Sequence, residues 1–169
     1  MFVVGMTVGL WAQSSGVMAD ALDMLSDAMA YGLSLFAVGR GIRFKRYSAR
    51  WTGATLMLLS IGIVADAVRR FLFGSEPLGA VMIAYSLLSL CVNVTVLLKL
   101  TKYRQGEINL RASWLCTRAD VIANFATLAA GLVVLTTGWR YADLLIGLAI
   151  GAYVAKEAAE IWRQSTQSL

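Results

Sequence analysis

Apolar stretches long enough to cross a lipid bilayer alternate with short polar connections along the whole chain. A transmembrane helix needs roughly 20 apolar residues to cross about 30 Å of hydrocarbon. The pattern predicts an all-α, six-helix transmembrane bundle that forms one domain over residues 1–169, with helices at about 1–13, 16–39, 51–73, 77–98, 110–137 and 141–162. The first stretch has only about two-thirds of the needed length at ~1.5 Å per residue, so we expect a truncated helix there.

Composition indicates that lipid is the solvent for much of the surface. Of the 169 residues, 59% are hydrophobic and 15% are charged, whereas soluble domains are about half apolar and about a quarter charged. Too few polar side chains remain to cover a water-facing surface. The net charge of +5 comes largely from short basic runs between apolar stretches, so we expect a bilayer and not a nucleic acid as the partner.

The connections alternate in charge. Segments 40–50 and 99–111 are basic, whereas segments 14–16, 74–77 and 138–141 carry few cations. By the positive-inside rule the basic connections and both termini lie in the cytoplasm, and we expect a multi-pass protein of a bacterial inner membrane. Arg69 and Arg70 lie at the opposite end, where they either reach the outer interface or pair with Asp66, three and four residues earlier.

Three acidic residues follow one face of the predicted second helix. At ~100° per residue, Asp20, Asp23 and Asp27 fall within about 60° of arc. A carboxylate at membrane depth costs at least ~2.5 kcal/mol, and three on one stripe repel one another unless they are protonated or share a cation. A divalent cation would relieve both costs. The alternatives are a capping or interfacial role for Asp20 and protonated structural carboxyls for Asp23 and Asp27.

The predicted fifth helix carries a second polar stripe. Cys116 and Asp120 are four residues apart and Asn124 follows one turn later, so they share one helix face. The alternative for Cys116 is a small buried apolar side chain, which is the usual state of a cysteine without a disulfide.

Depth favours a meeting of the two stripes near the midplane. Asp23 and Asp27 would lie about 10–17 Å below the outer surface, and Cys116 and Asp120 about 9–15 Å above the inner one. The chain contains no histidine, so its metal ligands must be oxygen or sulfur atoms. The sequence therefore predicts a metal site of four ligands, with two accessory candidates: Asp23, Asp27, Cys116 and Asp120, and then Asp20 and Asn124. Such a set suits Zn²⁺, and Cd²⁺, Co²⁺, Fe²⁺ and Mn²⁺ stay open.

We expect structural roles for the charged residues of the last predicted helix. Asp143 begins that helix, where the helix dipole stabilises an acid. Lys156, Glu157 and Glu160 are typical of a solvated helix end.

The motifs DMLSD and CTRAD, at 23–27 and 116–120, resemble the two halves of the metal site in the cation diffusion facilitator family. The resemblance covers the transmembrane domain only, because residues 1–169 contain no counterpart of the family's cytoplasmic C-terminal domain. It implies six transmembrane helices, a homodimer, and Asp23, Asp27, Cys116 and Asp120 as the metal ligands. Cys116 stands where the family usually has histidine or aspartate.

We therefore predict a transporter, not an enzyme, that carries Zn²⁺ or a similar divalent ion out of the cytoplasm in exchange for protons. Two alternatives remain. One is a membrane metal sensor or scaffold without transport. The other is an intramembrane metal-dependent enzyme, since aspartate-rich helices also hold Mg²⁺ for phosphoryl transfer; the depth of the site and the cysteine argue against it.

Overall fold

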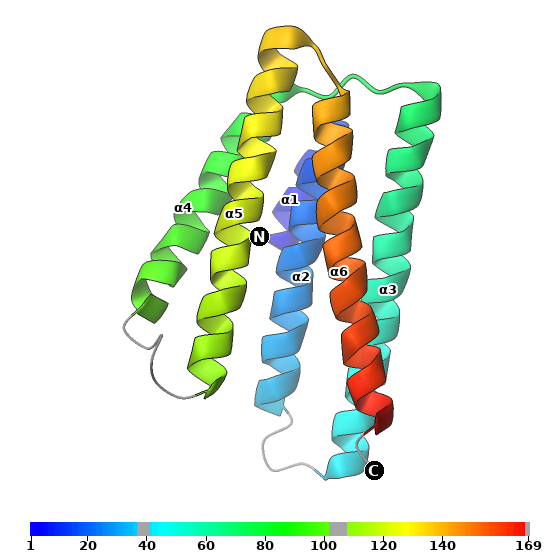
Figure 1. Cartoon of the computed structure of the whole chain (residues 1–169), viewed down its shortest axis with the longest axis vertical. Coiled ribbons are helices and arrows are strands. Elements are labelled where there is room, and N and C mark those ends of the chain that lie inside the picture. Colours follow the sequence, from blue (N-terminus) through cyan, green and yellow to red (C-terminus); the bar gives the residue numbers. More distant parts are fainter. Residues whose placement is uncertain (37–40, 102–107, 168–169) are drawn as a thin grey trace.

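The computed structural model of the chain describes residues 1–36, 41–101 and 108–167, apart from the side chains at 30, 31, 33–36, 42, 45, 46, 108–116 and 164–167. Within these residues the chain is all-α, as predicted, and has no strand. The helices run along the long axis of one bundle (Figure 1): α1 Phe2–Trp11, α2 Ser15–Phe36, α3 Ile42–Phe73, α4 Gly79–Thr101, α5 Ile108–Thr137 and α6 Tyr141–Gln167.

The start of α3 corrects the sequence prediction. The helix begins at Ile42 and not at Trp51, so the basic segment that was expected to be a connection forms its first turns. Segment 42–50 contains neither glycine nor proline, and arginine, lysine and alanine favour helix. At 32 residues α3 is about 48 Å long, which exceeds the hydrocarbon thickness of about 30 Å. Its basic turns therefore extend beyond the apolar layer.

Length and apolar composition mark two helical segments of the described residues as candidate membrane spans, Gly79–Thr101 in α4 and Thr117–Thr137 in α5. Helix α2 is different because it carries three aspartates within eight residues. Its polar face must therefore lie inside the bundle, where other helices shield it from lipid.

The helices pack most extensively in two pairs, α3 along α6 and α4 along α5. Helix α2 packs mainly on α6, α1 and α3, and its contact with α5 is smaller. Gly79 shows why the second pair approaches so closely: a Cβ there would lie 2.7 Å from the backbone nitrogen of Leu135 in α5. Small residues allow this approach in membranes.

Asp143 is predicted to stabilise the start of its own helix, α6. In the structure it also holds the start of α2. Its side chain is fully buried. The Ser14 hydroxyl and the Gly16 N–H donate to its Oδ1 at 2.6 and 3.0 Å, and the Ser15 N–H donates to Oδ2 at 2.8 Å. A helix start exposes unpaired N–H groups and the positive end of the helix dipole. The Asp143 side chain accepts hydrogen bonds from two of these N–H groups and places acidic oxygen atoms at the positive end. On α6, a Cβ at Gly147 would lie 2.6 Å from the Ser15 carbonyl carbon, so no larger residue fits there.

The last turns of α3 contain the ion pairs that the sequence suggests. Arg69 binds Asp66 Oδ1 at 2.8 Å, and Arg70 binds Asp66 Oδ2 through its Nε. Arg70 is buried, and its terminal nitrogen also reaches the Met18 sulfur at 3.7 Å. This cluster ties α3 to α2.

Candidate metal site

Helix α2 presents its three aspartates to the bundle interior. Asp20 is 2% exposed and Asp23 5% exposed, and Asp27 is partly buried. The 3.6-residue period places them on one side of the helix, as predicted.

Asp120 of α5 brings the two predicted stripes together. Its carboxyl group lies within hydrogen-bond reach of the carboxyl groups of both Asp23 and Asp27. Because α2 and α5 run in opposite directions (Figure 1), these side chains meet at one level of the bundle. Among the side chains that the structure describes, no three acidic or sulfur groups form a ready-made metal cage. The arrangement is therefore two pairwise contacts that share Asp120.

The fourth predicted ligand, Cys116, lies outside the described side chains. Its backbone belongs to α5, one turn before Asp120. Its role as a ligand stays a prediction.

The accessory candidates Asp20 and Asn124 bind each other. The Asn124 amide nitrogen donates to Asp20 Oδ1 at 3.0 Å and to the Asp120 backbone oxygen at 2.6 Å. The Ser89 hydroxyl donates to Asp20 Oδ2 at 3.4 Å, and the Tyr85 hydroxyl also lies within hydrogen-bond reach. Asp20 thus links α2 to α4 and α5 beside the other aspartates.

Glu157 of α6 corrects the expectation of a solvated helix end. It is partly buried, and the Ser26 hydroxyl donates to its Oε2 at 3.4 Å. It lies close enough to Asp23 and Asp27 for its charge to act on both. A signal existed in the sequence: Glu157 follows Ile150 and Val154 at helical spacing, and both are buried.

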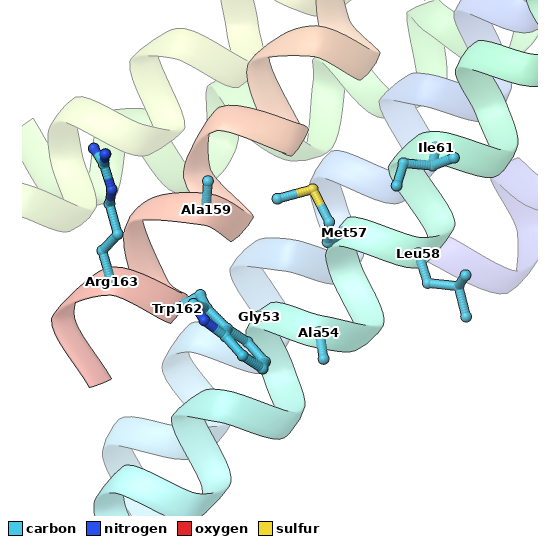
Figure 2. A pocket seen from close by; sticks show the side chains of 8 residues that line it. All are labelled: Gly53, Ala54, Met57, Leu58, Ile61, Ala159, Trp162 and Arg163. Atoms are coloured by element: carbon cyan, nitrogen blue, oxygen red, sulfur yellow. The ribbon is translucent and has the colours of Figure 1, made fainter. Parts of the chain in front are cut away.

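Two pockets differ in their relation to this site. One of about 260 Å³ reaches Asp23 between α5 and α6; its lining comprises Asp23, Ala119, Ile122, Ala123, Ala126, Ala149, Ile150 and Tyr153. A larger one of about 550 Å³ lies between α3 and α6 (Figure 2) and is lined by Gly53, Ala54, Met57, Leu58, Ile61, Ala159, Trp162 and Arg163. Because the larger pocket has no acidic side chain in its lining, it is not the metal site.

Carboxylates that converge from antiparallel helices inside an apolar bundle define a class of membrane protein that handles cations. The chain belongs to the cation efflux family, since the family model described as "Cation efflux transmembrane domain" matches residues 1–169. The resemblance to the cation diffusion facilitators is thereby confirmed, and the protein is a membrane protein.

Curated relatives agree with this family. The zinc transporter ZitB of Yersinia pestis is 28% identical over 183 residues, which cover 100% of this chain and 59% of the relative. The cadmium, cobalt and zinc/H⁺-K⁺ antiporter of Bacillus subtilis is 23% identical over 95% of this chain and 56% of its own length. The metal cation efflux system protein CzcD of Cupriavidus metallidurans is 22% identical over 86% and 50%. The chain thus spans only about half to three-fifths of these relatives.

Proposed function

We propose that this chain is the transmembrane part of a divalent metal cation efflux transporter and does not act as an enzyme. The observation that carries the proposal is the contact of Asp120 with both Asp23 and Asp27. The names of the relatives support zinc, cadmium or cobalt as the transported ion, and Fe²⁺ and Mn²⁺ are further candidates.

The carboxylates would bind the ion as a substrate in transit. Asp23, Asp27 and Asp120 would supply oxygen ligands and Cys116 a thiolate, a set that suits Zn²⁺. Metal ligands must be deprotonated, so protons compete with the metal for the same atoms. A proton gradient can therefore drive the ion out.

The packing of the helices suggests where movement would occur. The site joins α2, which packs largely on α6, to α5, which packs on α4. A shift of the α2–α3–α6 group against the α4–α5 pair would open the site to one side at a time, provided that the ion binds the two states differently.

Orientation and assembly complete the proposal. The basic first turns of α3 lie at the same end of the bundle as the last turns of α6 (Figure 1), and the positive-inside rule favours the cytoplasm for this end. The end of α6 would then be cytoplasmic, in a bacterial inner membrane, whereas the N-terminus of the chain lies part-way along the bundle (Figure 1). The family resemblance supports a homodimer.

Zinc uptake into proteoliposomes, with and without a pH gradient, tests the function. Wild type should show gradient-dependent flux, and Asp120→Ala should lose it while still inserting. Glu76→Ala is the matched control, because Glu76 is an exposed acid in the α3–α4 turn. Equal flux in wild type and Asp120→Ala would refute the assignment, whereas metal binding without flux would favour a sensor or scaffold.

A further inference from the structure

We propose that Glu157 is a capture ligand that takes the divalent cation from the proposed cytoplasmic side and passes it to the three aspartates. The inference rests on the proposed function, and it adds a third helix, α6, to a site so far built from α2 and α5.

The register between α2 and α6 places Glu157 at the correct depth. Asp143 binds the N–H groups of Ser15 and Gly16, so the two helices start at one level and run in the same direction. The contacts of Asp143 with Ser15 and Gly16 and of Gly147 with Ser15 give offsets between 127 and 132 positions. Glu157 is therefore level with segment 25–30, which includes Asp27.

The surroundings of Glu157 are those of a carboxylate that could bind a cation. It lies near two other carboxylates, Asp23 and Asp27. The ion pairs that Asp66 forms with Arg69 and Arg70 do not involve Glu157, whose hydrogen-bond donor is the Ser26 hydroxyl. Neighbouring like charges of this kind repel one another, and a shared divalent cation removes the repulsion.

The hydrogen bond from Ser26 also supports a role of Glu157 in cation binding. Its hydroxyl, buried on α2 between Asp23 and Asp27 in sequence, donates to Glu157 Oε2 at 3.4 Å. One neutral donor orients this carboxylate but does not neutralise it. Its remaining lone pairs can bind a metal ion.

The order of the carboxylates suggests the sequence of events. An ion that comes from the basic end meets Glu157 and Asp27 at one level, and then Asp23 with Asp120. Ion pathways need sites that bind strongly enough to admit the ion and weakly enough to release it. Glu157 together with Asp27, ahead of the full set of ligands, can serve as such a first site.

Helix α6 supplies a matched control for the test. Glu160 lies one turn beyond Glu157, carries the same charge and is exposed. Zinc association with the purified full chain in detergent is measured by stopped flow, and initial uptake into proteoliposomes is measured over a range of Zn²⁺ concentrations. Each assay compares wild type, Glu157→Gln, Glu157→Asp and Glu160→Gln.

Glu157→Gln should slow association about five-fold or more and raise the KM of uptake by a similar factor, with Vmax nearly unchanged. Glu157→Asp keeps the charge and should recover most of the rate, which separates capture from a folding defect. Glu160→Gln should behave as wild type.

Several results would overturn the inference. Equal association rates in Glu157→Gln and Glu160→Gln would remove the capture step, as would a lower Vmax at constant KM. If wild type binds Zn²⁺ at a rate that depends on Glu157 but shows no flux, the capture site stands and the transport function falls. If wild type does not bind Zn²⁺, both fall.

Discussion

Replacement of Asp143 by alanine should destabilise the protein severely, because this side chain of α6 caps the N-terminus of α2. The change removes the acceptor of three hydrogen bonds, from the Ser14 hydroxyl and the N–H groups of Ser15 and Gly16. Hydrogen bonds to a charged group contribute about 1.5–3 kcal/mol each, and buried donors without partners cost about 1–3 kcal/mol.

The three contributions do not add in full, because the Ser14 hydroxyl can turn and water can reach this end of the bundle. An N-cap substitution alone costs about 0.5–2 kcal/mol, and loss of one partner of a buried charged interaction about 3–5 kcal/mol. We therefore expect Asp143→Ala to lower the free energy of unfolding by about 3–5 kcal/mol. Asp143→Asn keeps one acceptor oxygen and turns an amide toward an N–H donor, so its cost should be about 1–3 kcal/mol.

Equilibrium unfolding in mixed micelles with increasing SDS measures these differences. Glu76→Ala is the control, since it removes an exposed acid from the same end of the bundle and should change stability by no more than about 0.5 kcal/mol. Hydrogen exchange should show faster exchange of the Ser15 and Gly16 amides in Asp143→Ala. If Asp143→Ala and Glu76→Ala unfold at the same SDS concentration, the capping role of Asp143 is wrong.

Three further predictions concern the site and the packing of the helices. Asp23→Asn and Asp27→Asn should each weaken zinc binding by about ten-fold or more, measured by calorimetry on the purified chain, and an unchanged Kd would remove that residue from the site. Zinc affinity should fall as the pH is lowered, because binding releases protons; calorimetry in buffers of different ionisation enthalpy counts those protons, and a pH-independent Kd would contradict direct competition. Gly147→Ala should cost about 1–3 kcal/mol because its Cβ would meet the Ser15 backbone, whereas Gly62→Ala meets nothing within 4 Å and should stabilise α3 by up to about 1 kcal/mol. A thermal shift of the same sign in both glycine variants would refute that contrast.

The face of α2 could be predicted because a helix has a fixed period. Asp20, Asp23 and Asp27 share one side whatever packs against it, and the depth argument needs only a rise of about 1.5 Å per residue. The meeting of Asp120 with Asp23 and Asp27 follows from these two constants once the helices are antiparallel. The prediction for the first turns of α3 is wrong because the length of an apolar stretch shows which part of a helix lies in lipid, and not where the helix begins.

The roles of Asp143 and Glu157 could not be derived in the same way, because they depend on which helices are neighbours. Helical period says that Glu157 shares a face with Val154, but not that α2 lies opposite. Once Asp143 binds the start of α2, the register of the two parallel helices is set, and Ser26 and Glu157 must then lie at nearly one level. One buried carboxylate in the first turn of α6 thus determines which acidic residue of α6 lies beside Asp23 and Asp27, and Asp143→Ala should alter the zinc association rate as well as stability.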